Sequence, residues 1–95
     1  MNDSMKKRLS LVVSVYNEEE ALEQFFQEAD RILRKVFWDY ELIFVNDGSQ
    51  DRSLEILNHL AEADEHVKIV SFSKNFGHEA AMIAGMDFAV GDGIV

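Results

Sequence analysis

The chain has 95 residues and a formal charge of −9, and 47% of its residues are apolar. This length allows one small domain, and this apolar content is enough for a packed core, which excludes a disordered chain. The negative charge would repel a nucleic-acid backbone, so DNA and RNA are excluded as expected partners. The absence of Cys excludes disulfides and thiolate metal sites. No apolar run approaches the roughly 18 residues of a membrane span.

The first half of the chain reads as strand, helix, strand. Residues 9–15 are apolar and rich in Val, which predicts a buried strand. Asn17, with Glu20 three residues later, resembles the capping box that begins a helix. Residues 41–46 predict a second buried strand. Between these strands, apolar residues recur at spacings of three and four and predict one face of a helix: Leu22, Phe25, Phe26, Ala29, Ile32, Leu33 and Val36.

The second half continues the alternation with a helix at 51–64, a strand at 67–72, a helix at 78–90 and the opening of a strand at 94–95. The third helix has little polar surface, so we expect it to be largely buried, with Gly85 packed closely on a neighbour. The pattern predicts a single α/β domain over residues 1–95, with 1–8 as a flexible tail. Its architecture is three-layer α/β/α around a mostly parallel open sheet.

Ligands of an open parallel sheet bind beyond the carboxyl ends of its strands. In the first loop there, Tyr16 is suited to stack on a base and Glu18 to accept hydrogen bonds from a sugar, although a solvated helix start explains both residues equally well. In the second loop, an Asx turn explains Ser49 and Asp51. Asp47 is explained less well by a turn, because a carboxylate at this edge offers two acceptor oxygens to ribose or base.

The third loop, residues 73–77, precedes a predicted helix. Backbone N–H groups at a helix start favour an anion and Lys74 adds a positive charge, so contact with a diphosphate is plausible. A tight turn at Gly77 is the structural alternative, and we expect a structural role for His78. The sequence contains no dinucleotide-binding glycine motif, no P-loop and no nucleophile elbow.

Four segments in order carry a family resemblance: VSVYNEE at 13–19, VNDGSQDRS at 45–53, KNFGHxxAxxxG at 74–85 and AVGD at 89–92. Together they resemble the amino-terminal part of a family-2 inverting glycosyltransferase of the GT-A fold. The branch they resemble most uses polyprenyl-phosphate or dolichyl-phosphate acceptors. The resemblance implies sugar transfer from a nucleotide-diphospho-sugar donor to an acceptor such as a polyprenyl phosphate. It also implies a cytoplasmic location, or one at the cytoplasmic face of a membrane.

The resemblance also implies roles for individual residues. The residues expected to bind the donor nucleotide are Tyr16, Glu18 and Asp47 at the base and ribose, Val45 in the base pocket and Lys74 near the nucleotide. The residues expected to shape the loops are Asn17, Gly48, Asn75 and Gly77, and Asp92 is expected to be structural.

In the family, an Asp-x-Asp motif at the end of the fourth strand binds Mg²⁺ or Mn²⁺, and the resemblance implies that it would follow just beyond Val95. We therefore expect residues 1–95 to contain no catalytic residue, to bind no metal ion and to lack transferase activity alone. The GT-A strand order 3-2-1-4 would leave much of the first strand exposed, and we expect this edge to support a homodimer.

Two alternatives stand beside this interpretation. The first is a non-catalytic nucleotide-binding or receiver-like signalling module. A receiver would need paired acids after its first strand and a phosphorylatable Asp after its third, and Tyr16–Glu18 and Ser73–Lys74 fit that pattern poorly. The second is a purely structural α/β unit with no ligand, which nucleotide-binding measurements would separate from the transferase.

Overall fold

The computed structural model describes residues 8–36, 39–89 and 93–94. Its elements follow the predicted alternation: β1 (Arg8–Val15), α1 (Leu22–Val36), β2 (Asp39–Asp47), α2 (Ser53–Ala63), β3 (Val67–Phe72), α3 (His78–Phe88) and β4 (Gly93–Ile94). The predicted elements are confirmed, with ends displaced by a few residues. Residues 1–7 of the expected tail, and Asp92, lie outside the described residues.

The strands form one parallel sheet in the order β3-β2-β1-β4, as predicted. β1 pairs with β2 along its whole length. On its other side, β1 meets β4 only at Leu9 and Ser10. Within the described ranges no strand pairs with the rest of that side of β1, and a homodimer through this edge stays a prediction.

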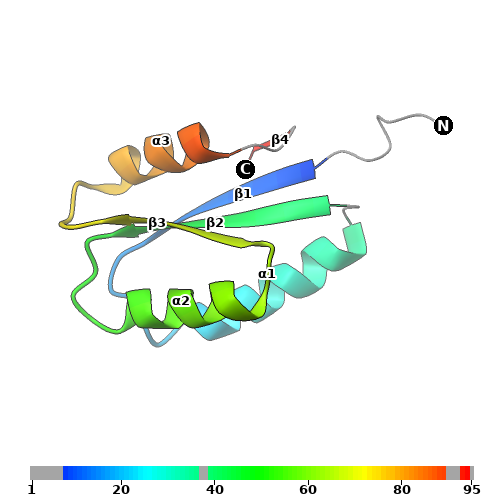
Figure 1. Ribbon diagram of the computed structural model, residues 1–95, viewed down its shortest axis with the longest axis horizontal. Coiled ribbons are helices and arrows are strands. Elements are labelled where there is room, and N and C mark those ends of the chain that lie inside the picture. Colours follow the sequence, from blue (N-terminus) through cyan, green and yellow to red (C-terminus); the bar gives the residue numbers. More distant parts are fainter. Residues whose placement is uncertain (1–7, 37–38, 90–92, 95) are drawn as a thin grey trace.

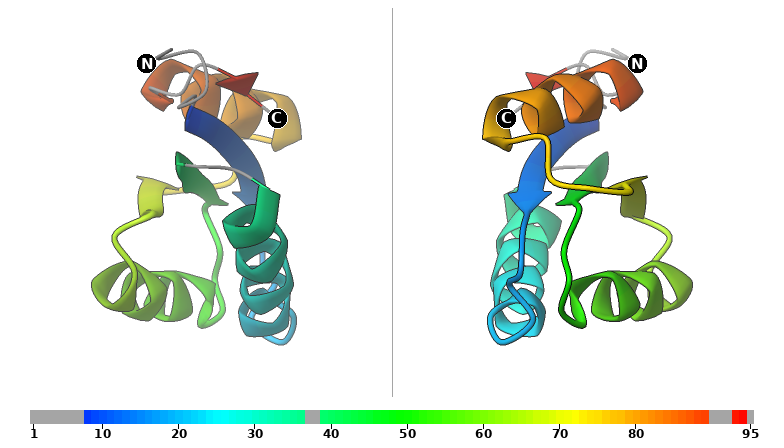
Figure 2. Two further views of the ribbon diagram at one scale, coloured as in Figure 1. Left: turned by 90° about the vertical axis from the view of Figure 1, so that its right-hand side faces the viewer. Right: turned by 90° about the vertical axis from the view of Figure 1, so that its left-hand side faces the viewer.

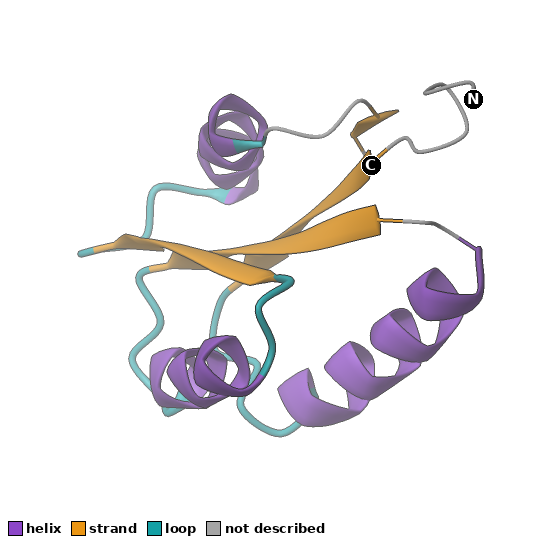
Figure 3. Ribbon diagram, turned by 45° about the vertical axis from the view of Figure 1, so that its right-hand side comes forward, coloured by secondary structure: helices purple, strands orange, loops and turns teal. Residues whose placement is uncertain are grey.

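Helices cover both faces of the sheet, with α1 and α2 on one face and α3 on the other (Figures 1 and 3). Alternation along β2 divides the core between these layers. Leu42 and Phe44 pack into the cluster formed with α1 and α2, whereas Ile43 and Val45 pack into the cluster with α3. Successive strand residues point to opposite faces, so a strand that is apolar on both faces contributes to two buried clusters. The predicted three-layer architecture is therefore confirmed.

Helix α3 lies close to the sheet through its smallest residues. Ala81 and Gly85 are buried, and a Cβ on Gly85 would lie 2.3 Å from Val12 Cγ1, which confirms the predicted close contact. The expectation that α3 is largely buried was wrong, because Ile83 is 61% and Met86 51% exposed. The helix packs on β1 and β2 with one face only, and no element among the described residues covers its other face.

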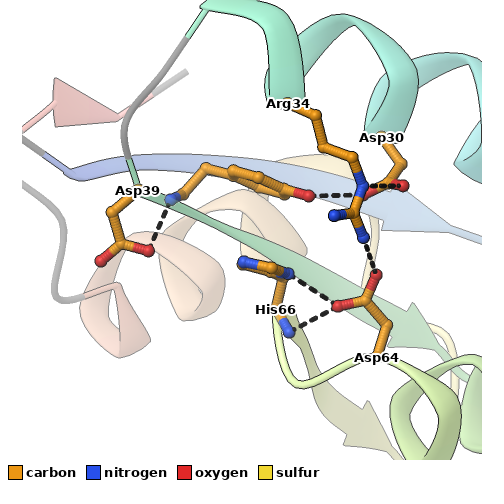
Figure 4. Close-up of polar contacts among 6 residues, drawn as sticks. Asp30, Arg34, Asp39, Asp64 and His66 are labelled. Atoms are coloured by element: carbon orange, nitrogen blue, oxygen red, sulfur yellow. Dashed lines mark hydrogen bonds and ion pairs between the residues drawn. The ribbon is translucent and has the colours of Figure 1, made fainter.

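A network of polar side chains fastens the amino-terminal edge of the sheet (Figure 4). The Tyr40 hydroxyl donates to Asp30 at 2.5 Å, and Arg34 contacts both Asp30 at 2.7 Å and Asp64 at 3.4 Å. His66 Nδ1 lies 2.7 Å from the Asp64 carboxylate, and its ring stacks on Tyr40 with 4.1 Å between centroids. The network joins α1, the start of β2 and the turn between α2 and β3.

The charges of this network alter the acidity of its members. Burial, together with the hydrogen bond to Asp30, raises the pKa of the Tyr40 phenol. Burial alone would raise the pKa of Asp30, but hydrogen bonds from Arg34 and Tyr40 outweigh it and lower that pKa. Asp30 is thus held as a carboxylate, and the Tyr40 hydroxyl keeps its proton and donates a hydrogen bond to it.

Candidate functional site

The loops that follow β1, β2 and β3 lie together at the carboxyl edge of the sheet, at the left of Figure 1 and facing the reader in the right panel of Figure 2. We call them loop 1 (residues 16–21), loop 2 (residues 48–52) and loop 3 (residues 73–77). Loops 1 and 3 lie on opposite sides of loop 2, because β1 and β3 flank β2 in the sheet. Loop 2 is therefore placed to bond to both neighbours.

Side chains in and just after loop 2 hold the backbone of loop 1. They accept three successive N–H groups: Ser49 Oγ from Asn17 at 3.0 Å, Ser53 Oγ from Glu18 at 2.9 Å and Asp51 Oδ2 from Glu19 at 3.1 Å. Two bonds run in the reverse direction. Asn17 Oδ1 accepts the Gln50 N–H at 2.8 Å, and Glu19 Oε1 accepts the Arg52 N–H at 3.0 Å. Loops 1 and 2 thus form one hydrogen-bonded unit.

The path of loop 1 corrects the capping-box prediction. Asn17 has φ of 53°, in the left-handed region, and α1 begins only at Leu22. The N–H groups of Ala21 and Leu22 are accepted by the backbone carbonyl of Glu18, not by a side chain of Asn17. Asn17 cannot cap α1 because its side-chain oxygen is bonded to loop 2. Asn tolerates this backbone conformation better than most residues.

Asp51 has two structural roles, of which sequence reasoning found one. Its Oδ1 accepts the N–H of Ser53 at 2.9 Å, which confirms the predicted Asx turn. Its Oδ2 reaches Glu19 in loop 1, a long-range bond that the local pattern did not predict. Partial burial would raise the pKa of Asp51, but the hydrogen bonds from Ser53 and Glu19 outweigh it and lower that pKa.

Asp47 holds loop 3. Its side chain is at the end of β2, and the residue is only 2% exposed. Oδ1 accepts the Phe76 N–H at 2.8 Å, and Oδ2 accepts the Gly77 N–H at 3.0 Å and the Asn75 side-chain amide at 3.1 Å. The carboxylate that we expected to face a ligand is therefore engaged by protein donors.

The backbone of loop 3 also presses on Gly48. This residue has φ of 71°, and a Cβ there would lie 2.2 Å from the carbonyl carbon of Lys74 and 2.3 Å from the nitrogen of Asn75. Only glycine fits such a contact at this backbone conformation. Val45, expected in the base pocket, has no exposed surface and packs beneath α3 near Gly85.

Three of the expected site residues keep their side chains open at this edge. Tyr16 is 44% exposed, and Glu18 and Lys74 are exposed as well. No described residue forms a hydrogen bond with the side chain of Tyr16, Glu18 or Lys74. The ammonium of Lys74 lies 5.3 Å from the centroid of the Phe76 ring. Glu18 borders a hollow of about 390 Å³ that is lined by Asn17, Glu18, Glu19, Glu20, Ala21 and Asp51.

A divalent cation needs several oxygen ligands. Within residues 8–36, 39–89 and 93–94 there is no group of three or more His, Asp or Glu side chains that could hold one. The carboxylates of Asp47, Asp51 and Glu19 are instead bonded to N–H groups of the loops. The described residues therefore do not fit a metal ion.

Comparison with known proteins identifies the family. The family model described as "Glycosyl transferase family 2" matches residues 10–95. The chain belongs to glycosyl transferase family 2. The resemblance inferred from the loop motifs is thus confirmed, and a receiver-like signalling module is excluded. Of the helices that the structure describes, none has the length and apolar character needed to cross a membrane.

Relatives of this family 2 chain include proteins with more specific names. It is 50% identical over 86 residues to the uncharacterized glycosyltransferase YkcC of Bacillus subtilis, covering 90% of this chain and 27% of that protein. It is 43% identical over 88 residues to a prophage bactoprenol glucosyl transferase homolog of Escherichia coli, covering 93% of this chain and 29% of that protein. The chain thus spans between a quarter and a third of the length of these relatives.

A solved structure supports the fold. The mannosyltransferase of Pyrobaculum calidifontis, in complex with GDP-Man and Mn²⁺, superposes with a TM-score of 0.77 at 20% sequence identity. The match covers 94% of this chain and 26% of that chain. The GT-A fold predicted from the sequence is therefore confirmed.

Proposed function

We propose that this chain forms the donor-nucleotide part of a glycosyltransferase that moves a sugar from a nucleotide-diphospho-sugar to a lipid phosphate. The observation that carries the proposal is the arrangement of the carboxyl edge. There, backbone N–H groups of loops 1 and 3 donate to side-chain oxygens at the end of β2, in loop 2 and at the start of α2, while Tyr16, Glu18 and Lys74 keep open side chains. Such an edge is where open α/β sheets bind ligands.

The three open residues supply complementary chemistry for a nucleotide. The ring of Tyr16 stacks on the base, a contact worth about 1–3 kcal/mol for aromatic side chains. The carboxylate of Glu18 accepts hydrogen bonds from ribose hydroxyls or from the base edge. The ammonium of Lys74 attracts the diphosphate. Val45 and Asp47 belong to the expected set too, but both are buried, so direct contact with a donor would require α3 or loop 3 to move.

The acceptor is proposed from the named relatives. Several are called bactoprenol glucosyl transferases, from Shigella phages for example, at about 42% identity. We extend this acceptor class to the full-length protein, where an oxygen of a polyprenyl phosphate would bond to the sugar as the bond from sugar to diphosphate breaks. A lipid acceptor places the reaction at a membrane, and we propose its cytoplasmic face. The divalent cation implied by the family, Mg²⁺ or Mn²⁺, is proposed for the full-length protein in the same way.

Titration of the chain with uridine diphosphate and guanosine diphosphate, followed by calorimetry or NMR, tests the donor site. We expect at least one of them to bind, and Tyr16→Ala to weaken that binding about tenfold through lost stacking. Ile83→Ala is the matched control, because Ile83 is an exposed apolar residue on the outer face of α3, away from the loops. If the folded protein binds neither diphosphate, the proposal is wrong and the purely structural alternative gains support.

A further inference from the structure

The buried carboxylate of Asp47 sits between the end of β2 and loop 3. A carboxylate that is 2% exposed is costly unless strong donors surround it. All three donors to its oxygens come from loop 3: the Asn75 side-chain amide and the backbone N–H groups of Phe76 and Gly77. Charge-assisted bonds of this kind are roughly twice as strong as neutral ones. Asp47 is therefore a strong determinant of where loop 3 lies.

The same bonds fix the start of α3. Gly77 precedes the helix with φ of 104°, and its carbonyl accepts the N–H of Ala81 at 3.1 Å. Among the residues that the structure describes, no side chain caps this helix start. By holding the N–H of Gly77, Asp47 sets the point at which the chain turns from loop 3 into α3.

Lys74 depends on this arrangement for its position. Its backbone touches Gly48, and its ammonium lies over the ring of Phe76, whose own N–H is bonded to Asp47. The Phe76 ring in turn meets Phe72 edge to face, with 5.4 Å between centroids. Loop 3 thus places the ammonium of Lys74 at the ligand edge, and its contact with Phe76 depends on the carboxylate of Asp47.

We propose that Asp47 is a positioning residue, whose carboxylate holds loop 3 so that Lys74 faces the donor diphosphate, and that it does not itself contact the nucleotide. For Asp47 to bind a base or ribose directly, it would have to release the N–H groups of Phe76 and Gly77, and the two charge-assisted hydrogen bonds that hold loop 3 would be lost. The part of this inference that concerns the diphosphate rests on the proposed function. The part that concerns loop 3 does not.

Amide hydrogen exchange in the protein without ligand tests the loop. In Asp47→Asn one acceptor oxygen becomes an NH₂ group, so we expect exchange at Phe76 and Gly77 to become at least about tenfold faster. Asp51→Asn is the matched control, because it should release the amide of Glu19 and leave Phe76 and Gly77 protected. Unchanged exchange at Phe76 and Gly77 in a folded Asp47→Asn protein would overturn the inference.

A second variant covers the case in which Asp47→Asn does not fold. Asn75→Ala keeps the carboxylate and removes one of its three donors. We expect a smaller acceleration of exchange at the same two amides, about two- to fivefold, because one charge-assisted bond that ties loop 3 to Asp47 is lost. No change in this variant would show that loop 3 is held by other contacts, and would contradict the inference.

A double-mutant cycle with the diphosphate that the wild-type protein binds tests the link to Lys74. We expect Asp47→Asn alone to lower affinity about tenfold, but to lower it less than about twofold once Lys74 is replaced by Ala, because both changes remove the same interaction. Equal losses in both backgrounds would mean that Asp47 contacts the nucleotide itself, and the inference would be wrong.

The two proposals fail in different ways. If the wild-type protein binds neither uridine diphosphate nor guanosine diphosphate, the proposed donor site is wrong and the diphosphate part of this inference falls with it. The hydrogen-exchange result in the protein without ligand still decides whether Asp47 holds loop 3.

Discussion

The two edges of this sheet are fastened by different kinds of hydrogen bond. At the carboxyl edge, side-chain oxygens of one loop accept backbone N–H groups of another, as Ser49 does from Asn17 and Asp47 does from Phe76. At the amino edge, the bonds that tie α1 to its neighbours run between side chains, as from Tyr40 to Asp30 and from Arg34 to Asp64 (Figure 4). The backbone N–H groups of Tyr40 and His66 bond to the nearby carboxylates of Asp39 and Asp64. The first kind of bond fixes the path of a loop. The second fixes the side chains themselves.

Because of this difference, side chains at the carboxyl edge remain free to bind a ligand, whereas those at the amino edge stabilise the fold. Every residue except proline has a backbone N–H group, so loop 1 is held without using the side chains of Tyr16 and Glu18. At the amino edge the polar side chains are committed to one another, which leaves them poorly suited to bind a ligand. We expect substitutions at the two edges to have correspondingly different effects.

The largest expected effect is that of Gly48→Ala at the carboxyl edge. The new Cβ would meet the backbone of Lys74 at 2.2 Å in a left-handed conformation. We expect a loss of about 2–4 kcal/mol in the free energy of unfolding, from backbone strain and overpacking together. Urea denaturation measures it, with Gln50→Ala, an exposed position of the same loop, as a control that should change little. A loss below 1 kcal/mol would mean that loops 2 and 3 separate easily.

The next largest effect is expected for Tyr→Phe at the amino edge, and the same substitution at the carboxyl edge is its control. Tyr40→Phe removes the hydroxyl that donates to Asp30 and keeps the ring that stacks on His66. We expect it to lower the free energy of unfolding by about 1–2 kcal/mol. Tyr16→Phe is the control at the carboxyl edge, where the hydroxyl has no described partner, and should leave stability within about 0.5 kcal/mol. Equal losses in the two variants would contradict the contrast between the edges.

Acid should weaken the amino edge through Asp30. Arg34 and Tyr40 lower the pKa of Asp30 in the folded protein below its ordinary value of 3.8, against the opposing effect of burial. The stabilisation is therefore complete above that value and is lost as the pH falls through the lower folded pKa. We expect Asp30→Asn to be less stable than wild type at pH 7, with a difference that shrinks below about pH 3.8. A difference that is constant with pH, measured by urea denaturation, would exclude this charge effect.

The smallest effect on stability is expected at Glu18, where the carboxylate has no described partner. Glu18→Gln should change the free energy of unfolding by less than about 0.5 kcal/mol. If the proposed function is right, it should nevertheless weaken diphosphate binding about fivefold or more, because a hydrogen bond to a charged acceptor is lost. Glu62→Gln, an exposed acid on α2, is the matched control for both measurements. A variant that binds normally would remove Glu18 from the proposed site.

Local patterns predicted most of the fold. The apolar runs and helical spacings located every described element, and Gly85 indicated a close packing contact that the structure contains. Composition could not show which faces of α3 are covered, since burial depends on neighbouring elements and not on the helix itself. Ile83 and Met86 therefore looked like core residues and are exposed.

The site was harder to predict because its bonds join distant parts of the chain. Asn17 looked like a helix cap, yet its oxygen bonds to Gln50, 33 positions away. Asp47 looked open to a ligand, but the donors that occupy it lie about 30 positions further along. The alternation of polar residues at Ser49, Asp51 and Ser53 was the one local sign that side chains of this segment reach across to a neighbour. The ligand roles of Tyr16, Glu18 and Lys74 stay predictions.

The bond that the Glu18 N–H donates to Ser53 Oγ has a consequence for how such a domain can diverge. Because the loop is anchored by its backbone, mutation can exchange the side chain at this position while the main chain keeps its course. The preference for one base or sugar over another could then change by single substitutions, without a compensating change elsewhere. A scaffold built in this way would tolerate drift in its specificity and still fold.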